Sequence, residues 1–348
     1  MKVNVLSDKI GWFGKYSGYE CLPDYYPKSI DATVNTATYN FYNKLLGKFY
    51  KVQNKINSRS EDIFNEIKFS RKVSSNDASH ILYLESHIHL LKSLSPRNKV
   101  FGTIHLPFSR WSPGCLELLS KMEHIILLYK EELEAFSQYI PKSKIHVIRH
   151  GVDVNFFKPG NPGEVNKNKV LFVGHFLRNF EMFFDVFKIL SKDNHNKFEF
   201  HFIIPTEHRH PPILKMLMTF NNVFFHENLS DEELLKHYQN SYVLLMPLED
   251  SGANTGIVQA LATGLPIITT DVGGIRSYGG DEVFPLVKNN DTQKMVELFY
   301  QYYNDIKFRN AISEKQRNFA VEKLDWLKVA QEHVNLYSSV KGLKLRRT

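Results

Sequence analysis

A loop of small polar residues, SGANTG at 251–256, has the composition of an anion-binding site. The Ala- and Leu-rich run IVQALAT follows it, predicts a helix, and is stopped by Gly264 and Pro266. The first N–H groups of a helix lack intrahelical partners and lie at the positive end of its dipole, so they attract phosphate. An ordinary connection before a helix uses the same residue types, so the loop alone leaves both interpretations open.

The elements around this loop indicate a parallel α/β sheet. Short apolar runs alternate with helical periods from about residue 168 onward, and the runs lie at 169–174, 198–204, 222–229 and 242–248. Such alternation predicts parallel strands joined by crossover helices. Ligands of these sheets bind at the carboxyl ends of the strands. The SGANTG loop directly follows one strand, which favours the anion site.

The first half of the chain predicts a second, less regular α/β domain. Its predicted strands include MKVNVLS, HILYLES, KVFGTIHLP and HIILLY, and a stretch rich in Pro, Gly, Asn and Lys near residue 160 suggests a linker. A length of 348 residues also favours two domains. We therefore expect two Rossmann-like domains, 1–158 and 159–325, facing each other across a cleft.

Composition and charge narrow the class of protein. The only cysteines, Cys21 and Cys115, have no disulfide or metal spacing. The chain begins without the apolar core of a signal peptide and has no run of membrane-spanning length, so we expect a cytoplasmic protein. The net charge of +7 lies entirely within residues 1–150, which predicts an anionic partner for that half. No nucleic-acid recognition motif is present, so nucleic acid is not expected to be the partner.

Five motifs in order make the chain resemble family 4 of the retaining nucleotide-sugar glycosyltransferases, also called glycosyl transferases group 1. They are IRHGVDVNFFKP, KVLFVGHFLRNFE, HENLSDEELLKHYQNSYVLLMPL, ALATGLPIITTDVGG and LDWLKVAQEHVNLY. The resemblance is dense over 145–340 and sparse over 1–100. It implies a GT-B fold with two Rossmann-like domains, in which 326–348 form a closing helix and tail that return toward the N-terminal domain.

The resemblance implies a donor site in the second domain. The donor diphosphate is expected at Arg178, Gly252, Ala253, Asn254 and Thr255, and the ribose or base at Gln259, Glu249 and Leu229. Family members usually carry two glutamates eight residues apart around this loop, and those positions hold Ser251 and Gln259 here. Gln259 can offer a carbonyl to a ribose hydroxyl, but without the charge that strengthens the bond.

In the first domain, the resemblance implies that His105 faces the donor sugar. Glu85, at the tip of another predicted strand, is expected to bind an acceptor hydroxyl or to assist its deprotonation. Gly14, Ser17 and Gly18 would let the backbone approach the phosphate or the acceptor. The residues alone leave open a structural histidine, a solvated carboxylate and a tight turn.

Two further features bear on partners and cofactors. Residues 40–59 predict a basic amphipathic helix with Phe41 and Leu45 on its apolar face, suited either to an anionic membrane surface or to packing on the sheet. The histidine sets His201, His208, His210 and His87, His89 lack convincing ligand spacing, so no metal site and no cofactor is expected.

The predicted function is transfer of a sugar from a UDP- or GDP-sugar to a hydroxyl of a glycan or lipid-linked acceptor, with retention of configuration and without a metal. The setting that the resemblance favours is bacterial surface polysaccharide synthesis, in the cytoplasm or peripherally at the inner face of the plasma membrane. The alternative is a non-catalytic nucleotide-sugar or glycan-binding protein on the same fold, which the Ser251 and Gln259 departures favour.

Overall fold

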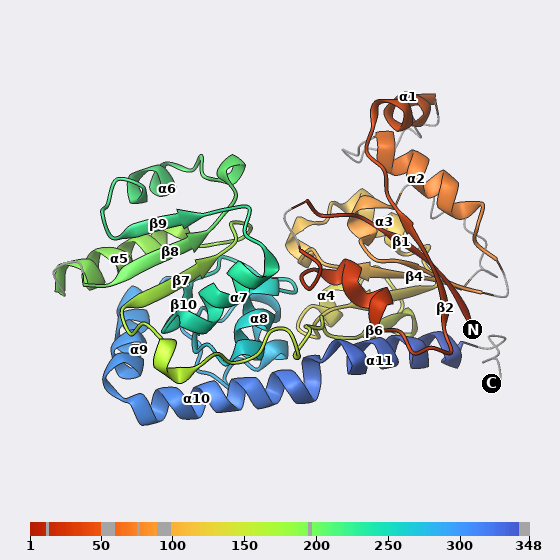
Figure 1. Cartoon of the computed structure of the whole chain (residues 1–348). Helices are drawn as coiled ribbons and strands as arrows, with labels where there is room; N and C mark the ends of the chain where they lie inside the picture. Colours follow the sequence, from red (N-terminus) through yellow and green to blue (C-terminus); the bar gives the residue numbers. More distant parts are fainter. Residues whose placement is uncertain (12–13, 50–59, 75–76, 89–98, 194–196, 341–348) are drawn as a thin grey trace. The chain divides into compact units, whose positions relative to one another are not determined.

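The computed structural model describes residues 1–11, 14–49, 60–74, 77–88, 99–193 and 197–340. The chain forms two compact units, which are considered separately (Figure 1). Unit 1 comprises 1–11, 18–150 and 326–348, and unit 2 comprises 12–17 and 151–325. Each unit contains one fully parallel sheet with crossover helices, which confirms the predicted α/β class with two Rossmann-like units. In the described part of the chain, no helix combines the length and apolar character needed to cross a bilayer.

Unit 1 is built on a six-stranded sheet in the order β2-β1-β3-β4-β5-β6. Its strands are β1 (Lys2–Ser7), β2 (Asp31–Thr36), β3 (Ala78–Ile81), β4 (Lys99–Ile104), β5 (His124–Leu127) and β6 (Ile145–Val147). Its α-helices are α1 (Phe41–Phe49), α2 (Ser60–Ser70), α3 (Pro113–Leu119), α4 (Leu133–Ser137) and α11 (Trp326–Ser339), and its longest 3-10 helix is η1 (Tyr19–Tyr25). The central strands β3 and β4 are almost wholly buried, as expected for a parallel sheet covered on both faces.

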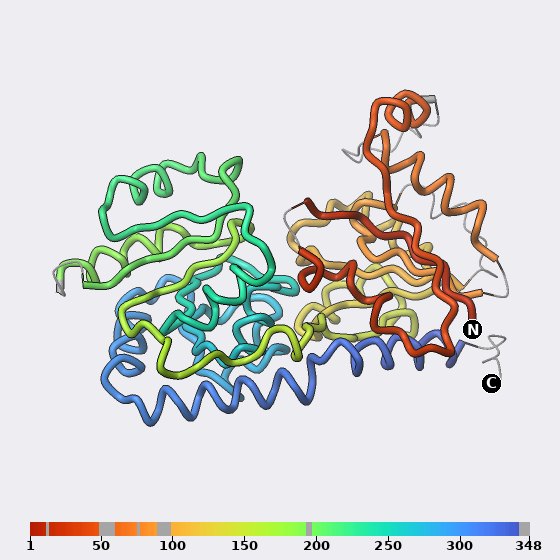
Figure 2. The backbone as a smooth tube through the Cα atoms, in the orientation of Figure 1, coloured from red at the N-terminus to blue at the C-terminus, as the bar shows by residue number. Residues whose placement is uncertain are grey.

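The C-terminal helix α11 packs within unit 1, beside η1 (Figure 2). Its inward face carries polar groups that are fully buried and hydrogen-bonded. His333 Nδ1 donates to the Val329 carbonyl at 2.7 Å, so its Nε2 accepts from the Tyr19 hydroxyl, also at 2.7 Å. The Tyr337 hydroxyl lies 2.7 Å from His80 Nδ1. These bonds satisfy buried donors and acceptors that would otherwise each be destabilising by about 1–3 kcal/mol.

Acid is expected to destabilise the chain through these buried histidines. Burial lowers the pKa of His333 to about 4 and holds the pKa of His80 well below its usual value. The unfolded chain binds protons near the ordinary histidine pKa of about 6.5, so this stability is present above that pH and is lost as the pH falls toward 4. Between about pH 7.5 and pH 5, His333 alone should lower the free energy of unfolding by roughly 2 kcal/mol.

Denaturant melts at the two pH values test this expectation. His333→Gln should flatten the pH dependence, whereas His210→Gln, at an exposed position of unit 2, should leave it unchanged. An equal slope in wild type and His333→Gln would contradict the assignment.

Unit 2 is built on a five-stranded sheet in the order β11-β10-β7-β8-β9. Its strands are β7 (Lys169–Val173), β8 (Glu199–Ile203), β9 (Val223–His226), β10 (Val243–Met246) and β11 (Ile267–Thr269). Its helices are α5 (Phe180–Asp193), α6 (Pro212–Leu217), α7 (Asp231–Asn240), α8 (Thr255–Thr263), α9 (Thr292–Asn304) and α10 (Ile306–Phe319). Helix α7 begins with a capping box between Ser230 and Glu233, the spacing visible in the sequence.

Candidate functional site

The loop after β10 leads directly into the N-terminus of α8. Asn254 caps this helix, because its side chain accepts a hydrogen bond from the Ile257 N–H, and Gly264 ends it in the left-handed conformation. No described residue accepts a hydrogen bond from the backbone N–H groups of Gly252, Ala253, Asn254 or Thr255. The loop therefore presents unpaired donors at the positive end of a helix, which can bind an anion.

Arg178 lies beside this loop, in the turn after β7. Its guanidinium donates to the carbonyls of Val173 (3.0 Å) and Phe176 (2.8 Å), and Nη2 lies 3.5 Å from Asn254 Oδ1. Burial lowers the pKa of Arg178 to about 10, which leaves the side chain cationic at neutral pH. Gly174 adopts a φ of +78°, and a Cβ there would lie 2.7 Å from Arg178 Nη2. The close approach of the cation to the loop therefore requires glycine at 174.

The glycine pair at 273–274 supports the loop from another side. The Gly274 N–H donates to the Ser251 carbonyl at 2.8 Å. Gly273 has a φ of +48°, and a Cβ there would lie 2.1 Å from the same carbonyl oxygen. Ser251 is buried and its hydroxyl donates to the Gly252 carbonyl at 2.9 Å. Ser251 thus shapes the loop from inside.

The predicted glycine loop is divided between the two units. Gly18 precedes η1 in unit 1, whereas 14–17 belong to unit 2. The Lys15 N–H donates to Asp231 Oδ2 at 2.7 Å, and the Ser17 hydroxyl accepts from the Gln259 amide at 2.9 Å. Gly14 lies against Asp231 so closely that a Cβ would lie 2.0 Å from its carboxylate. Gln259, predicted to contact the ribose, is buried and engaged with Ser17, while Glu249 is exposed and Leu229 is half-buried.

In unit 1 the two predicted catalytic residues, His105 and Glu85, are adjacent. His105 follows β4 and Glu85 lies in the 3-10 turn after β3, so both occupy carboxyl ends of neighbouring parallel strands. His105 Nδ1 lies 3.3 Å from Glu85 Oε1, and both side chains are about 15% exposed. Neither ring nitrogen of His105 has a hydrogen-bond partner among the described residues. Both ring nitrogens are buried, so their capacity for hydrogen bonding is unused in this structure.

Three neighbours of His105 were not recognised from the sequence. The Tyr83 ring stacks on His105 at 4.6 Å, and its hydroxyl donates to the Glu20 carboxylate and accepts from the Tyr19 N–H. The Tyr19 ring meets His105 edge-on at 4.9 Å. Burial raises the pKa of Glu20 despite the Tyr83 bond. Glu20 and His105 thus both contact Tyr83, and a buried carboxyl with a raised pKa is a feature often found at functional sites.

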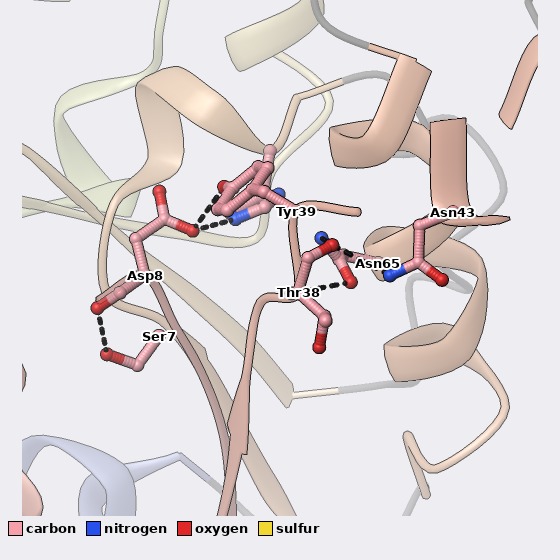
Figure 3. A network of polar contacts seen from close by, with 7 residues as sticks. Ser7, Asp8, Thr38, Tyr39, Asn43 and Asn65 are labelled. Atoms are coloured by element: carbon pink, nitrogen blue, oxygen red, sulfur yellow. Dashed lines mark hydrogen bonds and ion pairs between the residues drawn. The ribbon is translucent and has the colours of Figure 1, made fainter. Parts of the chain in front are cut away.

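A second polar network lies at the carboxyl end of β1 (Figure 3). Asp8 accepts from the Tyr39 hydroxyl and from His87 Nε2, each at 2.8 Å. Burial opposes both charges, but the bond between them lowers the pKa of Asp8 and raises that of His87. Nearby, Thr38 is held by the amides of Asn43 and Asn65. A cavity of about 190 Å³ next to this network is lined by Leu6, Asn35, Thr36, Thr38, Asn65, Lys68, Phe69 and Lys72.

The histidines considered from the sequence do not group with their near neighbours in the chain. His201 lies with His226 and His237, and this is the one group of metal-ligand type found among the described residues. His208 instead stacks on His175 in the turn after β7, and His210 is exposed. His87 pairs with Asp8, and its neighbour His89 lies outside the described residues.

Comparison with known proteins identifies the class to which this architecture belongs. The match to a structure of Alr3699/HepE from Anabaena in complex with UDP-glucose has a TM-score of 0.73 at 15% identity. It covers 98% of this chain and 100% of that chain. The match to sucrose-phosphate synthase from Thermosynechococcus elongatus has a TM-score of 0.74 at 13% identity. It covers 97% of this chain and 98% of that chain. The fold is that of the GT-B glycosyltransferases.

A family model and a curated relative both match part of unit 2. Residues 167–305 match the family model of the glycosyl transferases group 1. Over 110 residues, the chain is 29% identical to D-inositol 3-phosphate glycosyltransferase of Corynebacterium urealyticum. That match covers 31% of this chain and 26% of the relative, so it spans about a quarter of the relative's length. The similarity to the glycosyl transferases group 1 thus extends over residues 167–305, within unit 2.

Proposed function

We propose that the protein transfers a sugar from a nucleoside-diphosphate sugar to an acceptor hydroxyl. The observation that carries this proposal is the unpaired N–H array at the N-terminus of α8 with Arg178 beside it, inside the matched family domain. A diphosphate satisfies these donors and neutralises the cation. The UDP-glucose complex of the similar HepE structure supports a UDP-sugar as the first donor to test.

In the proposed reaction, the bond between the sugar C1 and the diphosphate oxygen breaks as the acceptor oxygen attacks C1 from the same face. The acceptor proton passes to the leaving phosphate oxygen, and the configuration at C1 is retained. Negative charge grows on the leaving diphosphate, so Arg178 and the α8 N–H groups stabilise the transition state without a metal. We assign His105 to the reacting sugar and Glu85 to the acceptor hydroxyl.

A panel of nucleotides tests the donor site. UDP, GDP, ADP and their sugar conjugates are added to the full-length protein, and the melting temperature is measured, because a ligand that binds only the native state raises it. We expect a shift with one base only. Arg178→Ala should abolish the shift, whereas Lys188→Ala, an exposed α5 residue paired with Asp185, should retain it. No shift with any nucleotide, or an unchanged shift in Arg178→Ala, would refute the donor site.

The second candidate is a nucleotide-sugar-binding protein without transfer activity. Its support is that Ser251 and Gln259 occupy the positions of the family's glutamates and are both buried, with Gln259 bonded to Ser17. Nucleotide release from the bound donor separates the two functions, because a binding protein shifts in melting temperature without turning over its ligand.

We further propose that α1 brings unit 1 to an anionic membrane carrying a lipid-linked acceptor. The helix packs on α2 through the buried Asn43 and Gly47 and leaves Phe41 80% and Tyr42 66% exposed, with Lys44 and Lys48 also exposed. Exposed aromatic side chains among lysines suit the interface of an anionic bilayer. Residues 50–59 of the predicted amphipathic segment lie outside the described residues.

Vesicle sedimentation tests the membrane surface. The double variant Phe41→Ser/Leu45→Ser should bind vesicles of phosphatidylglycerol and phosphatidylcholine about tenfold more weakly than wild type. The matched control, Met216→Ser/Met218→Ser, removes two exposed apolar side chains from unit 2 and should bind normally. Equal binding by both variants and wild type would exclude α1 as the contact.

A further inference from the structure

Three imidazoles converge in unit 2, on elements other than the loop before α8. His201 lies on β8, His226 ends β9 and His237 lies on α7. Ile203 pairs with His226, so His201 and His226 stand two positions apart on one face of the sheet. Their rings are parallel with centroids 5.2 Å apart, and His237 approaches His226 to 4.3 Å. One ring nitrogen of each residue lies within 4.8 Å of those of the other two.

This histidine cluster has unused bonding capacity. His201 Nδ1 and His226 Nε2 share one hydrogen bond of 2.9 Å. His201 Nε2 and His237 Nδ1 are buried and have no hydrogen-bond partner among the described residues. Buried polar atoms without partners are uncommon in native proteins, and an ion bound at His237 Nδ1 is one explanation for that atom.

Burial of the three rings favours their neutral form. Burial, reinforced by the positive charge of Lys169, lowers the pKa of His201 to about 3 and that of His237 to about 4. The same effects lower the pKa of His226. At neutral pH each ring therefore carries a lone pair, and neutral imidazole is the form that ligates metals.

We propose that His201, His226 and His237 bind one divalent transition-metal ion, with zinc as the expected ion and solvent in the fourth position. Three imidazoles form an established donor set for zinc, at Zn–N distances of about 2.0–2.1 Å, which separates tetrahedral ligand atoms by about 3.3 Å. The 2.9 Å hydrogen bond needs only a small opening to reach that separation.

The Glu199 carboxylate lies close enough to His201 to orient its ring as a metal ligand. When His201 Nδ1 binds the ion, the ring hydrogen is carried by Nε2, which lies 3.6 Å from Glu199 Oε2. Metal-bound histidines commonly donate their second N–H to such a carboxylate. The ion would join β8, β9 and α7. Since α7 also carries Asp231, which holds Lys15, the role we infer is to fix this helix on the sheet rather than to take part in sugar transfer.

The positive charge of Lys169 predicts the direction in which a substitution there changes metal affinity. It lines the hollow of about 380 Å³ next to the cluster, together with Leu229, Glu233, Lys236 and Asn240. Its ammonium repels a cation in the cluster, and its own pKa is lowered by burial. Removing this charge with Lys169→Met should tighten metal binding several-fold.

Calorimetric titration of chelator-treated, untagged full-length protein with zinc chloride tests the site. We expect one ion per chain, and a melting temperature that rises with zinc but not with magnesium. His226→Gln and His237→Gln should each weaken zinc binding by about tenfold or more, whereas His210→Gln should bind as wild type does. Zinc affinity that is unchanged in both cluster variants would overturn the proposal.

Cobalt absorption of the wild-type protein is a second test, which does not depend on whether the variants fold. A low-coordinate cobalt site gives intense visible bands, which zinc should remove by displacement. Absence of these bands at one equivalent of cobalt would also overturn the proposal. Neither measurement uses a nucleotide, so its outcome is independent of the proposed sugar transfer.

Discussion

Replacing His105 by alanine is expected to lower donor turnover by about a hundredfold or more, with nucleotide affinity nearly unchanged. The imidazole lies 3.3 Å from Glu85 Oε1, and its ring nitrogens have no hydrogen-bond partner among the described residues, so their bonding capacity is left for the sugar that we assign to it. A positioned acid–base or hydrogen-bonding group typically contributes about 10²- to 10⁴-fold to the rate. The measurement is nucleotide release from the donor identified by the melting panel.

The control for this prediction is a substitution at another histidine of unit 1. His124 on β5 is also partly buried in unit 1 but is bonded to His146, and His124→Ala should retain turnover within about threefold. Glu85→Gln preserves size and removes charge, and it should slow transfer to an acceptor more than hydrolysis of the donor. Unchanged turnover in His105→Ala would remove this residue from the reaction.

Gly273→Ala is expected to weaken nucleotide binding by about tenfold or more and to lower the melting temperature. A left-handed φ of +48° disfavours any side chain, and the new Cβ would lie 2.1 Å from the Ser251 carbonyl oxygen. The backbone can relieve this overlap only by moving the loop, which breaks the bond from Gly274 to Ser251 and displaces the N–H groups proposed to hold the diphosphate.

The control for this substitution is Gly163→Ala. Its nearest contact would be 3.4 Å away, and Gly163 is not in the left-handed region. It should leave nucleotide affinity and melting temperature almost unchanged. Full nucleotide affinity in Gly273→Ala would show that the shape of the 251–254 loop does not matter for the donor.

Local signals made the loop at 251–256 predictable. Asn254 as cap, Gly264 as the left-handed stop and Pro266 behind it all act within a few residues, so the sequence indicated this helix and its preceding loop. The helix begins at Thr255, slightly earlier than the apolar run suggested. Strand β2 gave no such signal, because it is an edge strand whose side chains are largely exposed.

Contacts between segments far apart in the chain could not be predicted from such local signals. Glu20 meets Tyr83 across more than sixty residues, and the histidine cluster gathers rings from three separate elements. His208 and His210 are the histidines nearest to His201 in the sequence, whereas its partners in the cluster lie farther along the chain. Likewise, nothing local indicated that 14–17 would join unit 2 while Gly18 joins unit 1.

The place of α11 determines the order in which the two units can be completed during synthesis. Unit 2 ends at Asp325, so all of its residues have been made before any part of α11. Unit 1, although begun first, waits for Trp326–Ser339, because until then Tyr19 and His80 lack their partners His333 and Tyr337. A chain growing at about 5–20 residues per second therefore finishes its first-made unit last, and the nascent protein carries an incomplete N-terminal core through most of translation.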